Sequence, residues 1–169
     1  MTFKLSILYR IAKIDLMFDW NNLFLSCAHC NNIKNDKYTP ILDCTRTDVD
    51  KKIAFHRYRE LFEEDRLDIV ALDDSLETKN TADLMNEVYY GTTPQKKAEA
   101  KIIRERLSKE LDEFQDCVKS YNLADGEDKK DCELSIMMKL KWNAPFAAFK
   151  RWMIRDASDK FPELLKYCQ

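Results

Sequence analysis

The sequence WNNLFLSCAHCNNIKNDK, residues 20–37, decides the fold of the first part of the chain. It contains Cys27 and Cys30, two thiols separated by two residues, and Asn31 follows directly. Two thiolates at this spacing can bind one side of a tetrahedral zinc ion. The apolar run at residues 23–25 predicts a short buried strand that leads into the cysteine pair. The polar segment from Asn31 onward predicts a short helix.

The pattern W-x-N-L followed by C-x2-C-N-x2-K resembles the second half of an HNH endonuclease domain. It is most similar to the HNH proteins found with retrons and with Septu-type anti-phage systems. The resemblance is strongest over residues 18–45 and continues more weakly at residues 86–101 and 144–156. It implies a partial ββα-metal element, similar to a treble clef, in residues 1–48, followed by a helical region in residues 49–169.

The resemblance also assigns roles to individual residues. Asn31 matches the last residue of the motif, which binds the catalytic divalent cation, and Asn22 matches the middle asparagine, which fixes the loop. Both are therefore candidate catalytic residues. In that family Mg²⁺ or Mn²⁺ neutralises the scissile phosphate and stabilises the leaving oxygen, while a histidine on the first strand activates water. Cys27 and Cys30 match half of a structural zinc site.

Three basic residues near the cysteine pair are candidates for DNA contact. Lys34 matches the basic residue that the family places near the phosphate. Lys37 and Arg46 are assigned because they lie close to the cysteine pair in the sequence, where cations would meet the nucleic-acid backbone. The alternative for all three is an ordinary solvated charge.

The cysteine pair and Asn31 have plainer alternatives. A tetrahedral zinc site takes four ligands, so Cys27 and Cys30 alone are equally compatible with a reduced, metal-free pair. Cys44 or His56 would be needed to complete the site. A redox pair is disfavoured because no βαβ pattern surrounds the cysteines. Asn31 is equally suited to capping a helix.

The chain has only two histidines, His29 and His56. We expect His29 to point to solvent and His56 to be a hydrogen-bonded surface or core residue rather than a base. The nineteen residues before Trp20 contain neither Cys nor His, so the family's general base is absent from its expected place. This indicates either an N-terminally truncated relative or a front end that has diverged with loss of catalysis.

The residues and the resemblance together predict a function. The first hypothesis is metal-dependent cleavage of DNA phosphodiester bonds in anti-phage defence, with DNA and a defence-system ATPase as partners. The alternative is a catalytically dead relative that binds DNA or protein, which the missing histidine favours. A third hypothesis is a helical interaction module in which the cysteine pair is incidental.

Composition sets the fold class and the compartment. The chain is 45% hydrophobic with two Gly and four Pro, which predicts an α+β, mostly helical fold. Residues 61–91 carry nine Asp/Glu against two Lys/Arg, so this stretch is a poor DNA surface and is expected to face solvent or a partner. No apolar run approaches the roughly 18 residues of a membrane span, and no secretory signal precedes the cysteines. We therefore expect a cytoplasmic protein without membrane contact.

Hydrophobic periodicity predicts the remaining elements. Strands are expected at residues 2–9, where a helix is the alternative, at 23–26 and at 68–72. Helices are expected at 31–36, 50–64 (alternatively an edge strand at 53–55), 81–90, 92–122, 131–142, 144–156 and from 162 to 167. The helix at 92–122 has an apolar stripe of Ile103, Leu107, Leu111, Phe114, Val118 and Tyr121. The helix at 131–142 is expected to pack through Leu134, Met137, Met138 and Lys141, and Asn143 is expected to cap the next helix.

Overall fold

The computed structural model describes residues 3–7, 23–35, 37–60 and 62–169. The fold is α+β and mostly helical, as the composition predicts. The chain forms two compact units, one of residues 1–54 with 68–102 and the other of residues 55–67 with 103–169. The predicted boundary between residues 48 and 49 stays a prediction. In the described part of the chain, no helix combines the length and the apolar character needed to cross a membrane.

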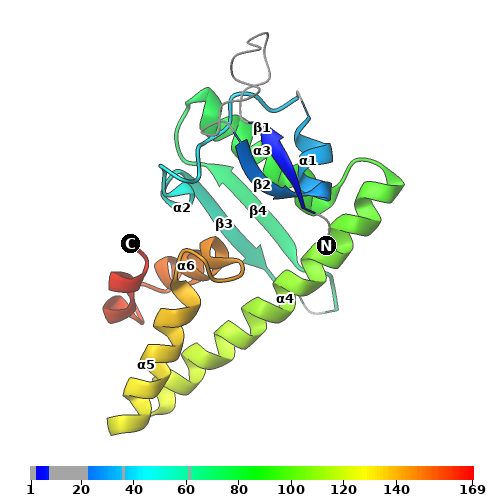
Figure 1. Ribbon diagram of the computed structural model, residues 1–169. Helices are drawn as coiled ribbons and strands as arrows, with labels where there is room; N and C mark the ends of the chain where they lie inside the picture. The colour runs from blue at the N-terminus through cyan, green and yellow to red at the C-terminus, as the bar shows by residue number, and fades with distance from the viewer. Residues whose placement is uncertain (1–2, 8–22, 36, 61) are drawn as a thin grey trace. The chain divides into compact units, whose positions relative to one another are not determined.

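The first unit begins with a hairpin that runs directly into a helix (Figure 1). Strand β1, Phe3–Ile7, pairs antiparallel with β2, Leu23–Cys27, with Leu5 opposite Leu25. Helix α1, Ala28–Lys34, follows at once. The strand expected at residues 2–9 is confirmed over residues 3–7, and the rest of that range lies outside the described residues, but the helix begins three residues earlier than predicted. The reason is local: Cys27 is the N-cap, and its sulfur accepts a hydrogen bond from the backbone N–H of Cys30 at 3.3 Å.

The region expected to form a helix over residues 50–64 is instead a short helix followed by a strand. Helix α2, Val49–Lys52, is one turn long, and β3, Ile53–Tyr58, follows it and pairs with β4, Arg66–Ala71. The alternative of an edge strand was therefore right. Three consecutive residues from Ile53 to Phe55 are at most 3% exposed, and a strand covered on both faces buries consecutive residues, whereas a surface helix does not.

Helix α3, Leu76–Tyr90, completes the first unit and contacts α1. It begins five residues earlier than predicted because Ser75 is a side-chain N-cap that accepts from the Thr78 N–H. It ends at Gly91, as the sequence predicts, with φ of +66°. A Cβ at Gly91 would lie 2.5 Å from the backbone carbon of Lys96, so only glycine fits this turn.

The second unit is built on the C-terminal part of α4, Pro94–Leu123. Helix α5, Gly126–Leu140, helix α6, Ala147–Asp156, and the 3₁₀ helix η3, Pro162–Tyr167, supply the rest of its core. The predicted stripe of α4 is largely confirmed, since Leu107, Leu111, Phe114 and Tyr121 are at most 4% exposed. The buried cluster consists of Phe114, Tyr121, Ile136, Leu140, Ile154, Leu164 and Cys168.

Two sequence predictions about the second unit are wrong. Helix α5 packs through Ile136 and Leu140, whereas Leu134 and Met138 of the expected set are half exposed. Helix α6 begins at Ala147 rather than 144, and its N-cap position is held by Phe146, not Asn143. Phe146 has a left-handed backbone conformation with φ of +51°, which a right-handed helix does not contain, so the helix begins only at the next residue.

Candidate site at the start of helix α1

The cysteine pair lies at the junction between β2 and α1. The two sulfur atoms of Cys27 and Cys30 are 3.0 Å apart, and both residues are partly buried. Burial raises the pKa of the Cys30 thiol, and the neighbouring Cys27 raises it further. Because a thiol with a raised pKa stays protonated at neutral pH, Cys30 is a poor nucleophile.

The described residues do not by themselves complete a zinc site around these cysteines. Zinc–sulfur bonds of about 2.3 Å in a tetrahedron hold two sulfurs about 3.8 Å apart, farther than the 3.0 Å found here. Across residues 3–7, 23–35, 37–60 and 62–169, no group of three or more His, Cys, Asp or Glu is placed to hold a metal ion. Cys44 is exposed. Zinc binding stays a prediction.

Asn31 lies inside α1, one residue after Cys30. The N-cap of α1 is Cys27, so the alternative that Asn31 caps the helix is wrong. Its backbone carbonyl accepts from the Asn35 N–H at 3.1 Å, and its side chain is partly buried. Asn22, the second candidate catalytic residue, lies outside the described residues.

The three basic candidates differ in exposure. Lys34, in the last turn of α1, is only 5% exposed, which favours a structural role. The side chains of Lys37 and Arg46 are 62% and 72% exposed. Arg46 pairs with Asp43 at 3.5 Å. Lys37 and Arg46 therefore keep cationic groups at the surface, where a phosphate can reach them.

Lys37 also belongs to a cluster around Glu87 of α3. The Glu87 carboxylate accepts hydrogen bonds from Lys37 and the Tyr38 hydroxyl, both at 2.6 Å, and from Thr92 and Lys96, both at 3.1 Å. Burial alone would raise the pKa of Glu87, but these donors outweigh it and lower the pKa to about 2. The cluster ties the segment after α1 to the end of α3. No sequence signal predicted this cluster, because Glu87 lies in an acidic stretch that is expected to be solvated.

His29 is buried, which corrects the prediction that it points to solvent. Its side chain is 9% exposed. Nδ1 lies 2.6 Å from the Glu99 carboxylate and Nε2 lies 2.9 Å from the Val88 carbonyl oxygen. Both ring nitrogens are therefore engaged in contacts within the first unit. In this arrangement neither nitrogen faces an open position where a metal or a substrate could bind.

His56 is hydrogen-bonded, as expected. Its Nδ1 lies 2.9 Å from the Asp156 carboxylate, and its ring packs edge-on against Trp152 with 5.1 Å between centroids. The side chain is 24% exposed. These contacts give His56 a packing role within the second unit.

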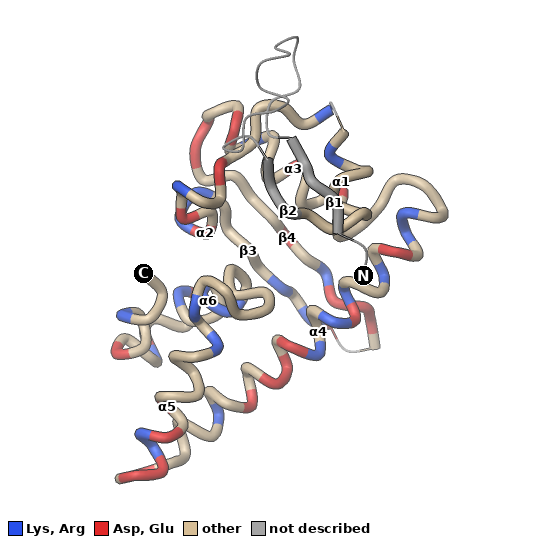
Figure 2. The backbone as a smooth tube through the Cα atoms, in the orientation of Figure 1, with Lys and Arg blue, Asp and Glu red and all other residues tan. Residues whose placement is uncertain are grey.

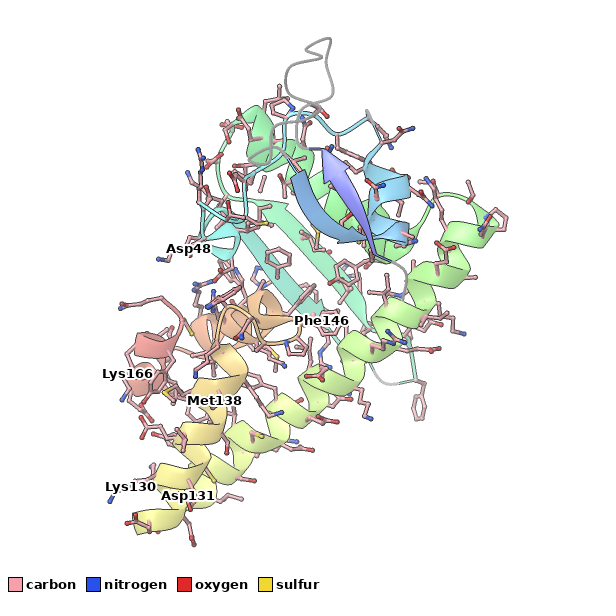
Figure 3. The ribbon with its side chains drawn as sticks, viewed as in Figure 1. Asp48, Lys130, Asp131, Met138, Phe146 and Lys166 are labelled. Carbon is pink, nitrogen blue, oxygen red and sulfur yellow. The ribbon has the colours of Figure 1, made fainter. Side chains whose placement is uncertain are left out.

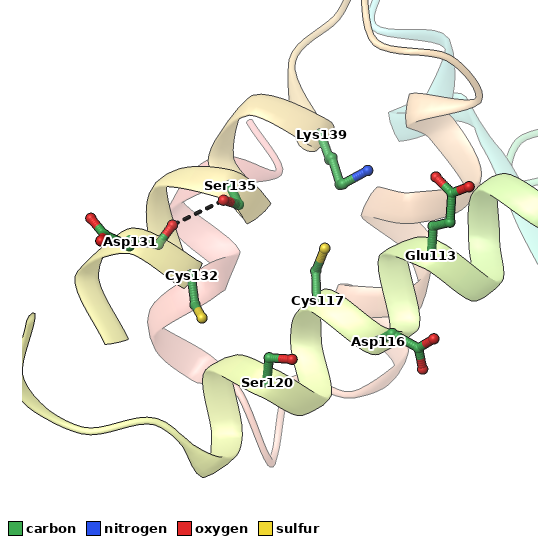
Figure 4. A pocket seen from close by; sticks show the side chains of 8 residues that line it. All are labelled: Glu113, Asp116, Cys117, Ser120, Asp131, Cys132, Ser135 and Lys139. Atoms are coloured by element: carbon green, nitrogen blue, oxygen red, sulfur yellow. Dashed lines mark hydrogen bonds between the residues drawn. The ribbon is translucent and has the colours of Figure 1, made fainter. Parts of the chain in front are cut away.

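The second unit also contains an open cavity between α4 and α5, with a volume of about 540 Å³ (Figure 4). Cys117 and Glu113 of α4 line it, as do Cys132 and Lys139 of α5. Its walls combine acidic, hydroxyl and thiol groups with a single lysine. The Asp131 carboxylate points away from the cavity (Figure 4), and the Asp131 carbonyl accepts from the Ser135 hydroxyl at 3.0 Å.

Comparison of the chain with protein-family models, with curated proteins and with solved structures finds no match.

Proposed function

We propose that the chain is an HNH-type endonuclease that cleaves DNA phosphodiester bonds with Mg²⁺ or Mn²⁺ in anti-phage defence. One observation carries the proposal: an antiparallel hairpin runs without a linker into a helix that bears Asn31, with the cysteine pair at the junction. Strand, strand and helix in this order are what a ββα-metal element requires. The motif over residues 18–45 supports the same reading.

Asn31 is the residue of α1 that would bind the catalytic cation. An amide oxygen suits Mg²⁺, which takes six oxygen ligands in octahedral geometry. The described residues supply too few ligands to hold the ion alone, so the remaining ones would come from phosphate, water and residues outside the described ranges. Lys37 and Arg46 are exposed cations that would contact the DNA backbone in exchange for their carboxylate partners Glu87 and Asp43.

The second candidate is a catalytically inactive relative that binds DNA or a protein partner such as a defence-system ATPase. The hydrogen bonds made by both histidines favour this inactive relative. Both nitrogens of His29 are hydrogen-bonded, and His56 bonds Asp156. The 169 residues contain no third histidine, so a general base would have to be another group.

A plasmid-nicking assay with Mg²⁺ or Mn²⁺ separates the two candidates. An active nuclease converts supercoiled plasmid to open circles, and chelation with EDTA stops it. Asn31→Ala should lower the rate by roughly a hundredfold or more, the scale expected for a lost transition-state contact. Asn32→Ala is the matched control, because Asn32 is the adjacent, exposed asparagine of the same helix, and it should keep the wild-type rate.

Equal cleavage by wild type and Asn31→Ala would discard the assigned site and point to a contaminating nuclease. If no preparation cleaves the plasmid, a DNA-binding measurement decides between an inactive relative that binds DNA and one that binds protein. Fluorescence anisotropy over a salt series should show weaker binding at higher salt, and Lys37→Ala with Arg46→Ala should reduce the slope. Absence of both cleavage and salt-dependent binding would leave only the protein-binding alternative.

A further inference from the structure

Helix α5 exposes an apolar face that the core of the second unit leaves uncovered. Leu134 is 55% exposed and Met138 is 50% exposed, and Trp142, directly after the helix, is 85% exposed. Residues four apart lie on one side of a helix, so Leu134 and Met138 form one apolar stripe of α5, and Trp142 follows just beyond the end of the helix. A contiguous apolar stripe on a surface marks an interaction site more often than scattered apolar residues do.

Opposite charges border this stripe at its two ends. Asp131 precedes Leu134 by three residues, and Lys141 follows Met138 by three residues. Lys130 and Trp142 lie four residues from Leu134 and Met138 respectively. In the described part of the chain, neither Asp131 nor Lys141 takes part in an ion pair. Figure 2 shows the charges gathered in the first turns of α5 and the uncharged middle of the helix.

The equal spacing makes the stripe complementary to itself when two copies run antiparallel. If Leu134 faces Met138 of the partner subunit, then the 1.5 Å rise per residue places Asp131 opposite Lys141 of the partner subunit. A parallel pairing would bring like charges together instead.

We propose that α5 pairs antiparallel with α5 of a second copy of this chain, through Leu134 and Met138 at the centre and Asp131 with Lys141 at the ends. The arrangement has twofold symmetry, in which the same patch serves both copies. Figure 3 marks Lys130, Asp131 and Met138 along the helix. One helix per copy gives a small contact, so the dimer is weak and depends on protein concentration.

Sedimentation velocity of the full chain over a wide range of protein concentration tests the proposal. The wild-type protein should shift from monomer to dimer as concentration rises. Met138→Glu places a charge in the apolar centre and should weaken association roughly tenfold or more. Leu123→Glu is the matched control, because Leu123 is an apolar residue at the end of α4 that is 82% exposed, and it should dimerise like the wild type.

A charge exchange makes the test specific for the antiparallel register. Asp131→Lys alone puts lysine opposite lysine at both ends and should weaken the dimer roughly tenfold. Adding Lys141→Asp restores opposite charges and should return the affinity toward the wild-type value. All these positions are exposed, and circular dichroism confirms that each variant is folded.

Three results would overturn the proposal. A wild-type chain that stays monomeric at every concentration assigns the stripe to a different partner. A dimer that tolerates Met138→Glu forms through another surface. A double exchange that dimerises no better than Asp131→Lys rules out the antiparallel register.

Discussion

His29 Nδ1 lies 2.6 Å from the Glu99 carboxylate, while Nε2 of the same ring lies 2.9 Å from the carbonyl oxygen of Val88. Val88 lies near the end of α3 and Glu99 near the start of α4, so the His29 ring links α1 to both helices. The histidine inside the C-x2-C pair is thus a structural residue that holds the helix bearing Asn31 in contact with α3 and α4.

Replacing His29 should destabilise the first unit. His29→Ala removes two hydrogen bonds and leaves the Val88 carbonyl without its partner. The free energy of unfolding should therefore fall by about 1–3 kcal/mol. Urea unfolding at neutral pH measures this loss. His56→Phe is the control, because it keeps a ring to pack against Trp152 and removes only a bond between side chains that are 24% and 50% exposed, which should contribute under about 1 kcal/mol. An equal decrease in the free energy of unfolding for both variants would contradict the proposed role of His29 in linking the three helices.

The Glu87 cluster should make stability depend on pH in the acid range. The pKa of Glu87 falls from 4.5 to about 2 on folding, so its contribution is complete above pH 4.5 and is lost as pH falls toward 2. Glu87→Gln should therefore destabilise the protein by up to about 3 kcal/mol at pH 7. The difference between wild type and variant, measured by urea unfolding at several pH values, should shrink below pH 4.5. A difference that is constant down to pH 2.5 would refute the lowered pKa.

The cysteine pair allows a direct test of zinc binding. Under the proposed function, the chain purified from zinc-containing medium should carry zinc, and Cys27→Ser should remove it. Cys117→Ser is the matched control, since Cys117 lies on α4 in the other unit. Elemental analysis gives the zinc content per chain. A wild-type value near zero would show that Cys27 and Cys30 are a metal-free pair.

Removing the buried Lys150 and removing its partly exposed partner Glu110 should lower the free energy of unfolding by different amounts. Lys150 is 1% exposed, and its Nζ lies 2.8 Å from Glu110 Oε2. Glu110→Gln leaves a buried ammonium without its countercharge, which should cost about 3 kcal/mol or more. Lys150→Met fills the same space without a charge and should cost less. Thermal or urea unfolding ranks the two variants, and the reverse order would contradict this account.

The sequence alone predicted the elements whose signals are local. The apolar run before Cys27 specified β2, and the stripe from Leu107 to Tyr121 specified α4, because strand and helix periods appear directly in neighbouring residues. The turn at Gly91 was also predicted, since only glycine adopts its backbone conformation at low cost. The cysteine spacing was equally visible, although no spacing tells whether a metal binds.

Only the tertiary structure decided which face of each element is covered. Helix α5 carries apolar residues on two faces, and the packing of its neighbours buried Ile136 and Leu140 while Leu134 and Met138 stayed exposed. The segment after Asp50 has a helical pattern, but pairing with β4 made it a strand. The partners of His29 lie 59 and 70 residues away in the chain. Contacts at such separations depend on how helices meet in space, and local sequence patterns do not encode that.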